Sequence, residues 1–189
     1  AGGGSTGGSI ALGGSTLTVG DLDTSTTYAG IISGSGGLIK VGLGTLTLSG
    51  DNTFTGAIHV NEGILKVGHT DALGADDTSV AKVIVADGAT VDLGGIIDAK
   101  YGYTIAGTGA LGTGAIINTG NHIGNSTLQS TNIQLAADAM IGGTGNFALL
   151  AQDYAATTLD LATHTLTKAG TNTFTVVNTT FKAGTVRVA

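Results

Sequence analysis

The chain lacks cysteine, proline and tryptophan, and it holds one glutamate and seven basic residues in a length of 189. The absence of cysteine excludes disulfide bridges and thiolate metal sites. The basic residues are scattered and the net charge is −6. A nucleic-acid partner or an anionic lipid surface needs a basic face, so neither is expected. No apolar run approaches the roughly eighteen residues of a membrane helix.

The first residues also lack the charged and then apolar pattern of a secretion signal, so we expect a mature or excised portion of a longer protein. Residues 1–9 are rich in Gly and Ser. This composition predicts a flexible lead-in. We expect residues 10–189 to form the folded segment.

What the chain does contain is 34 Gly and 31 Thr, together with recurring Val, Ile and Leu. Short runs such as 45–48, 64–67 and 185–188 alternate apolar and polar residues, which indicates strands with one buried face. Gly, Asn or Asp lies in nearly every gap between these runs. The sequence therefore predicts an all-β fold, with short helices considered only for residues 71–73 and 147–155.

One stretch of the sequence, residues 34–67, reads as a repeat unit, and a degenerate copy lies at 165–188. Several residues of the two copies correspond at an offset of 120, or 121 after one insertion. We predict structural roles in the repeat for eight of them: Gly50, Asn52, Phe54, Gly63, Gly170, Asn172, Phe174 and Gly184. Internal repeats of this kind indicate a solenoid.

The bends between runs favour a parallel β-helix over hairpins. An apolar residue, a two-residue gap, Gly and a new run recur at residues 60–65 and, about 25 residues later, at 85–91. Hairpins would show Asn-Gly or Asp-Gly between paired runs, and Asp87-Gly88 is the one such signal, so a hairpin stays open there. At about 22 residues per coil the chain would form roughly eight coils.

Residues 38–42, 44–50, 52–56 and 60–67 resemble the passenger-associated transport repeat, also called the autotransporter-associated β-strand repeat. The resemblance implies a right-handed parallel β-helix in a passenger that is secreted or exposed on the surface of a Gram-negative bacterium. It also implies that the repeat aids passage through the outer membrane, and that a translocator barrel lies elsewhere in the full-length chain. Phe54 stands where the family often has Tyr, and the second copy lacks the Gly that follows Thr55.

Parts of the sequence also resemble what two other classes of protein need. A polysaccharide-degrading β-helix needs carboxylates that converge in one groove, for which Asp76, Asp77, Asp92 and Asp160 are the candidates. A Thr-rich ice-binding solenoid needs one Thr-x-Thr pair per coil, and the pairs here are irregularly spaced. We therefore expect no enzyme.

The sequence matches known cofactor-binding and metal-binding motifs only incompletely. Residues 107–112 match a dinucleotide fingerprint in letters, but no helical pattern follows them. Residues 142–149 resemble a calcium-binding nonapeptide, but Phe147 stands where a carboxylate is needed. The four His residues show no close spacing typical of metal ligands. We expect no cofactor and no metal.

The sequence thus predicts a structural segment of an autotransporter passenger that aids export and presents an adhesion surface. Its expected partners are host-cell or bacterial surface ligands, or further copies of itself. The expected location is the bacterial cell surface or the medium outside the cell.

Overall fold

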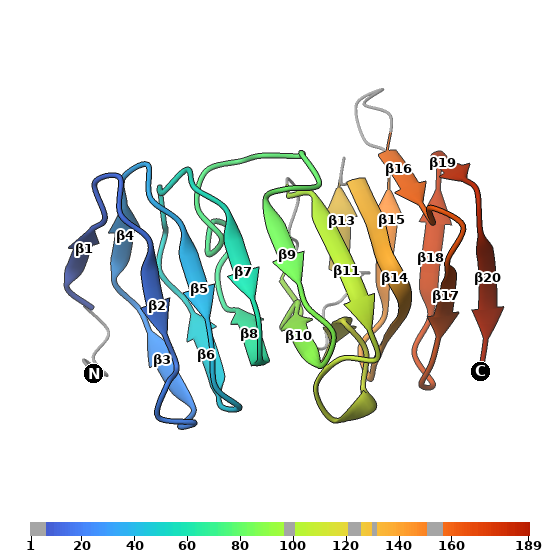
Figure 1. The fold of residues 1–189 in the computed structure, drawn as a ribbon, viewed down its shortest axis with the longest axis horizontal. Coiled ribbons are helices and arrows are strands. Elements are labelled where there is room, and N and C mark those ends of the chain that lie inside the picture. The colour runs from blue at the N-terminus through green and yellow to red at the C-terminus, as the bar shows by residue number, and fades with distance from the viewer. Residues whose placement is uncertain (1–6, 97–100, 121–125, 130–131, 151–156) are drawn as a thin grey trace.

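The computed structural model describes residues 7–96, 101–120, 126–129, 132–150 and 157–189. It shows a β-solenoid in which short strands stack side by side along the long axis, with the two chain ends at opposite ends of the stack (Figure 1). Every assigned pair of strands is parallel. The predicted all-β parallel architecture is therefore confirmed.

The strands fall into three stacks, which we call faces A, B and C. Face A holds β2 (Leu17–Val19), β5 (Leu38–Lys40), β7 (Ile58–Val60), β9 (Val83–Val85), β11 (Tyr103–Gly107), the first part of β14 (Asn132–Gly143), β16 (Thr157–Asp160) and β19 (Thr179–Lys182). Face B holds β3 (Thr26–Tyr28), β6 (Thr45–Leu48), β8 (Gly63–Val67), β10 (Ala89–Asp92), β12 (Ile116–Asn118), the second part of β14, β17 (Thr165–Lys168) and β20 (Thr185–Val188).

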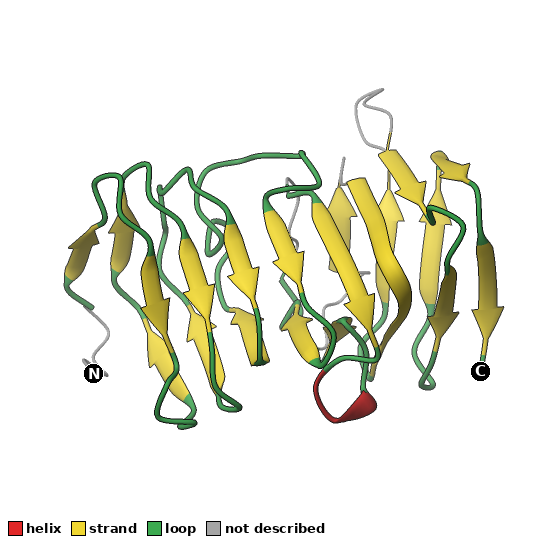
Figure 2. Cartoon of the chain, in the orientation of Figure 1, coloured by secondary structure: helices red, strands yellow, loops and turns green. Residues whose placement is uncertain are grey.

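Face C holds β1 (Ser9–Ala11), β4 (Ile31–Ser33), β13 (Ser126–Gln129), β15 (Phe147–Leu150) and β18 (Phe174–Val177). Beyond β4 the face continues as far as Ala75 through backbone bonds without assigned strands, since Thr53 N donates to Ile32 O at 2.9 Å and Ala75 N donates to Phe54 O at 3.0 Å. The assigned helix is the short 3-10 turn η1 (Ala110–Gly112) (Figure 2). In the described part of the chain, no helix is long and apolar enough to cross a bilayer.

The order A, B, C repeats from β2 to β18 and gives about seven turns, with β1 before them and β19 and β20 after them. The predicted number was roughly eight. The difference arises because coil length varies: Leu38 pairs with Ile58, twenty residues later, but Tyr103 pairs with Ile133, thirty residues later. The right-handed sense implied by the resemblance stays a prediction.

The core is a set of apolar rows that run along the stack. On face A, one such row consists of side chains that are each at most 2 % exposed: Leu38, Ile58, Val83, Tyr103, Ile133 and Leu159. Burying one such side chain contributes about 1.5–3 kcal/mol relative to leaving it exposed. Because each coil contacts mainly its neighbours, the stability of the stack is approximately a sum of coil and interface terms.

Three local expectations differ from the structure. Residues 71–73 form a turn rather than a helix, and residues 147–150 form strand β15, with 151–155 outside the described residues. Asp87 and Gly88 do not close a hairpin, because β9 and β10 pair with strands of neighbouring coils and not with each other. Ser9, the last residue of the expected lead-in, already belongs to β1.

Candidate functional site

The first repeat copy places Asn52 inside the corner between faces B and C, where its side chain is 2 % exposed. Its Oδ1 accepts a bond from the backbone N of Ile32 at 2.7 Å, and its Nδ2 donates to the carbonyl of Ala72 at 2.6 Å. Ile32 belongs to the preceding coil and Ala72 to the following one. One amide therefore joins three successive coils.

Phe54 lies two residues further along the same corner and is fully buried. The Nζ of Lys82, from the following coil, lies 4.9 Å from the centroid of the Phe54 ring and donates to the carbonyl of Gly56 at 2.9 Å. A cation over an aromatic ring is attracted by the negative face of the ring. The predicted repeat residues Asn52 and Phe54 thus hold neighbouring coils together from adjacent positions.

The glycines of the first copy lie where coils approach too closely for a side chain. A Cβ on Gly50 would lie 2.0 Å from the carbonyl oxygen of Gly30, in the coil before it. Gly63 opens β8 with φ of +61°, and a Cβ there would lie 2.5 Å from the Gly42 carbonyl oxygen. Residues with a side chain rarely adopt that backbone conformation. At both glycines a Cβ would thus collide with a backbone carbonyl oxygen of the preceding coil.

A feature that sequence reasoning missed is the buried lysine Lys40, which is 1 % exposed at the corner between faces A and B. Its Nζ donates to the carbonyls of Val41 at 2.8 Å, Gly42 at 2.6 Å and Glu62 at 3.3 Å. Burial lowers the pKa of Lys40, and the nearby carboxylates of Glu62 and Asp23 oppose that change. The lysine thus donates to three backbone carbonyls that converge at this corner.

The second copy occupies equivalent places near the C-terminal end of the stack. Asn172 is 8 % exposed and donates from Nδ2 to the carbonyls of Gly142 at 3.2 Å and Gly145 at 2.9 Å. Phe174 is half-buried, and its ring lies 5.0 Å from that of Phe147 at a tilt of 44°.

Gly170 and Gly184 have φ of +78° and +135° and lie at corners, as Gly50 and Gly63 do. A Cβ on Gly184 would lie 2.2 Å from the Cβ of Leu161, in the coil before it. The structure thus brings each predicted residue of the second copy to the corner expected from the first. Their proposed role in the repeat stays a prediction.

The carboxylates considered for sugar cleavage do not form one groove. Asp92 lies on face B and bonds Lys66 at 3.1 Å and the hydroxyl of Thr119 at 2.6 Å. Asp160 lies on face A, 3.6 Å from Lys182. Both are thus engaged in ion pairs on different faces. Asp76 and Asp77 lie in the loop before β9, where Asp77 Oδ1 accepts a bond from the backbone N of Ser79.

One cluster of potential metal ligands could not be seen from sequence spacing. Ligand atoms of Asp51, His69 and Asp71 all lie within 4.8 Å of one another, because stacking brings residues of adjacent coils together. The Nδ1 of His69 accepts a bond from the backbone N of Asp71 at 3.1 Å, so that lone pair is already used. The side chains of His69 and Asp71 are about two-fifths exposed.

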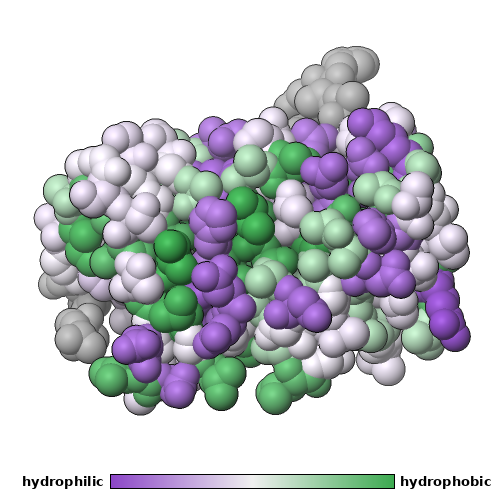
Figure 3. All heavy atoms as spheres, viewed as in Figure 1, coloured by the Kyte–Doolittle hydropathy of each residue, from purple (hydrophilic) through white to green (hydrophobic). Residues whose placement is uncertain are grey.

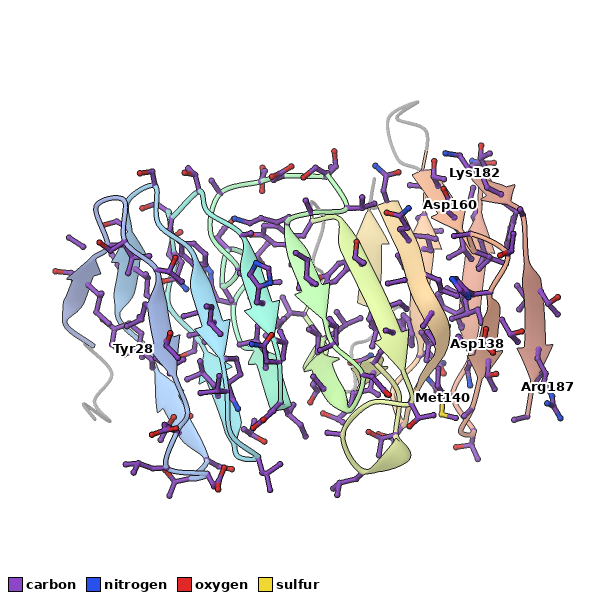
Figure 4. The ribbon with its side chains drawn as sticks, viewed as in Figure 1. Tyr28, Asp138, Met140, Asp160, Lys182 and Arg187 are labelled. Atoms are coloured by element: carbon purple, nitrogen blue, oxygen red, sulfur yellow. The ribbon has the colours of Figure 1, made fainter. Side chains whose placement is uncertain are left out.

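The outward side of face A is a continuous surface along the stack. Strand register aligns its outward residues in one row: Thr18, Ile39, His59, Ile84, Thr104, Gln134, Asp160 and Lys182. A depression of about 450 Å³ lies beside the C-terminal half of the row, between Asn132, Gln134 and Lys182. Figure 4 shows Asp160 and Lys182 together at this end, and Figure 3 shows polar and apolar groups mixed over this side.

The stacked parallel strands and the tight corners between them define a β-solenoid repeat protein. Comparison with known proteins gives its family. The family model described as passenger-associated-transport-repeat matches residues 38–67. An adhesin autotransporter of Brucella suis biovar 1 (strain 1330), named Adhesin BmaC autotransporter, is 32 % identical over 165 residues. That alignment covers 74 % of this chain and 5 % of the relative, so the chain spans a small part of that protein's length. No solved structure matches.

The chain is therefore an autotransporter passenger repeat domain, as the resemblance implied. It is a structural segment of a passenger, and passengers of this class are exposed on the bacterial surface or secreted.

Proposed function

We propose that the coils bearing the repeat at 38–67 aid export by forming a stable stack early, on the outer side of the membrane. The observation that carries this proposal is the Asn52 amide, which bonds the coil before it at 2.7 Å and the coil after it at 2.6 Å. These coils are also short: Leu17, Leu38 and Ile58 follow one another on face A at spacings of 21 and 20 residues.

Short coils favour early folding because closing a short loop costs less conformational entropy than closing a long one. Each coil can then add to the preceding one through parallel strand pairs, without waiting for distant parts of the chain. A stack formed outside the membrane would not slip back through a translocator. The outer-membrane translocator that this proposal needs would belong to the longer protein.

The test is the deletion of one coil in phase from the full-length protein. Removing residues 38–57 joins Gly37 to Ile58, which already occupies the same place on face A as Leu38. The matched control removes residues 83–102, also one coil of twenty residues, and joins Lys82 to Tyr103. Surface display is measured by protease accessibility on whole cells, against total protein.

We expect the deletion of 38–57 to reduce display several-fold more than the control deletion does. Equal display of the two deletion variants would overturn the export role and leave a purely structural one. Thermal unfolding of the two purified 169-residue products of this chain separates a loss of export from a general loss of stability.

A second proposed function is an adhesion surface along the outward row of face A. It is supported by the similarity to a relative named as an adhesin and by the length of the row, which runs from Thr18 to Lys182. Half-buried Ile39, His59 and Ile84 offer apolar and aromatic area at its centre. Polar and apolar groups in one flat row suit a protein or glycan surface.

Binding of the purified chain to cultured epithelial cells and to surfaces coated with fibronectin, laminin or collagen tests this role. Thr104→Lys and Gln134→Lys alter the row, and Thr47→Lys on face B is the matched control. Loss of binding with the first two variants alone would support face A. Absence of binding by the unaltered chain to all four surfaces would leave the scaffold role without adhesion.

A further inference from the structure

Three strongly exposed leucines share one edge of the stack. We call edge AB the row of turns that join face A to face B, at residues 20–25, 41–44, 61–62, 86–88, 108–115 and 136–138. On this edge Leu22, Leu43 and Leu111 are 83 %, 75 % and 94 % exposed. Single exposed apolar residues need no explanation, but a group on one edge does. Among the described residues, the other exposed large hydrophobic side chains lie in β4 or in the last three strands: Ile31, Val177, Phe181, Val186 and Val188.

The exposure of Leu43 and Leu111 is a property of their turns and not of the chain ends. Each turn has a coil of this chain on both sides, since β5 lies between β2 and β7, and β11 lies between β9 and β14. The backbone N of Leu43 donates to Asp23 Oδ1 at 2.7 Å, which ties this turn to the one before it.

Leu111 also has an unfavourable backbone conformation. Its φ is +58° and its ψ is 19°, in the turn η1. Residues with a side chain rarely adopt this region, which Gly occupies without cost. An almost fully exposed leucine gains no packing within the fold that would offset this strain. Strain of this kind is often kept for function, which indicates that the side chain contacts something outside this chain.

Edge AB is acidic as well as apolar. The six turns that define it contain no Lys or Arg, and Lys40, which lies beneath the edge, is buried and bonded to carbonyls. A surface with charges of one sign attracts a partner of the opposite sign. The partner that fits is therefore cationic. The exposed carboxylates of the edge are those of Asp21, Asp23, Glu62, Asp87 and Asp138.

Stacking brings the central groups of the edge into one line. Leu43, Glu62, Asp87 and Leu111 belong to the turns after β5, β7, β9 and β11, which are consecutive neighbours on face A. Three steps of about 4.8 Å separate the first from the last, so the line spans about 14 Å. The turns after β2 and β5 and the loop with η1 project at the lower edge of Figure 1. Figure 3 shows hydrophobic beside hydrophilic groups there.

An α-helix laid along this line nearly matches its spacing. The helix advances about 5.4 Å per turn, so three turns cover about 16 Å. One side chain per turn can therefore face each coil in succession. Apolar side chains on the first and fourth turns would contact Leu43 and Leu111, and basic side chains on the two turns between would face Glu62 and Asp87. Anionic lipid and nucleic acid do not fit, because the carboxylates repel them.

We propose that edge AB binds a cationic α-helix that carries apolar and basic side chains on one face, with the helix axis along the stack. Recognition of a helix through apolar anchors at successive turns is a common mode of peptide binding. Edge AB is a different surface from the outward row of face A. The proposal therefore rests neither on the export role nor on the adhesion role.

The test uses a fluorescent, Ala-rich helical peptide of about eighteen residues, roughly five turns. One face carries Leu, Lys, Lys and Leu at positions i, i+4, i+7 and i+11, and a second peptide of the same composition places Leu and Lys on opposite faces. Fluorescence anisotropy with the 189-residue chain at low salt measures affinity. We expect the first peptide to bind several-fold more tightly than the second, and added salt to weaken its binding.

The sharpest variant is Leu111→Gly, because it should weaken binding several-fold while the melting temperature stays the same or rises. Glycine removes the apolar anchor and also relieves the backbone strain at φ of +58°. A purely structural role of Leu111 would not separate the two measurements in this way. Leu43→Ser should also weaken binding several-fold, whereas Ile31→Ser, outside edge AB, should not.

Charge is tested by Glu62→Gln together with Asp87→Asn, which should weaken binding several-fold and reduce its dependence on salt. Asp51→Asn with Asp71→Asn is the matched control, since it removes equal charge at the corner between faces B and C. Equal losses in these two double variants, equal affinity for the two peptides, or no binding at low salt would each overturn the proposal. Binding to phosphatidylcholine vesicles in place of the peptide would also overturn it.

Discussion

The two copies of the repeat place the same residue types at the same corners, yet they have different surroundings. Asn52 and Phe54 lie inside the stack, with coils on both sides that supply Ile32, Ala72 and Lys82 as partners. Asn172 and its neighbour Phe174 belong to the last full turn, and the contacts found for them come from the preceding coil.

The difference shows that a repeat residue in a solenoid has no fixed energetic value of its own. Its contribution depends on how many neighbouring coils it can reach, because stability is carried by the interfaces between coils. Phe54 is fully buried whereas Phe174 is half-buried, although the local sequence Asn-Thr-Phe-Thr is the same in both copies. The comparison can be tested by matched substitutions.

The largest difference is expected for the phenylalanines. Phe54→Ala should lower the free energy of unfolding by about 3–5 kcal/mol, because it leaves a cavity in the core and removes the ring beneath Lys82. Phe174→Ala should cost about 1–2 kcal/mol, because less of its surface is removed from water. Urea denaturation followed by circular dichroism measures both, with Phe54→Leu as a control that keeps most of the volume. Equal losses in the two copies would contradict the comparison.

A smaller difference is expected for the asparagines. Asn52→Ala removes the partners of the Ile32 N–H and the Ala72 carbonyl and should cost about 2–4 kcal/mol, since each buried group left unpaired costs about 1–3 kcal/mol. Asn172→Ala also removes an acceptor that has no donor among the described residues, so we expect a loss of about 1 kcal/mol. The same denaturation experiment applies. Asn52→Asp is the control, because its carboxylate can accept from Ile32 but cannot donate to Ala72.

The smallest effect concerns the buried lysines and pH. Burial lowers the pKa of Lys40 and of Lys168 below the ordinary value of 10.5. Between the lowered pKa and 10.5 the unfolded chain binds more protons, so these lysines make the free energy of unfolding rise with pH in that window. Relative to Lys40→Met or Lys168→Met, the unaltered chain should therefore gain stability as pH rises toward 10.5.

Added salt should change the pH-dependent stability differently for Lys40 and Lys168. Glu62 and Asp23 raise the pKa of Lys40 against the effect of burial, whereas burial alone lowers that of Lys168. Added salt weakens the carboxylate attraction. The pH-dependent gain should thus grow with salt for Lys40 and stay constant for Lys168 in thermal or urea unfolding. An identical salt response would show that the carboxylates do not influence Lys40.

Much of the fold could be predicted because strands with one buried face leave a period-two pattern, as in residues 45–48 and 64–67. The number of coils could not be predicted as closely from the sequence. The thirty residues from Tyr103 to Ile133 include the loop around η1, and no periodic pattern reveals the length of that loop. Residues 147–150 could be taken for part of a helix. They form a strand because Phe147 pairs with Phe174, a contact between distant parts of the chain.

The repeat glycines, asparagines and phenylalanines could be identified because two copies within one chain reveal which positions recur. The lysines could not, since a lysine in an alternating run such as 38–41 reads as a solvent-facing residue. Lys40 is buried because a corner of the solenoid supplies carbonyls to its Nζ. The approach of Asp51 to His69 and Asp71 likewise depends on stacking, which the order of residues alone does not encode.

The parallel register between coils has a mechanical consequence. Leu38 and Ile58 occupy neighbouring places on face A although twenty residues separate them. Those twenty residues would span about 66–72 Å if fully extended, but adjacent strands lie only about 4.8 Å apart. Each coil that forms therefore shortens the end-to-end distance of an extended chain by roughly 60 Å. Tension on the chain acts over that distance, so pulling opposes the addition of every coil and favours its release.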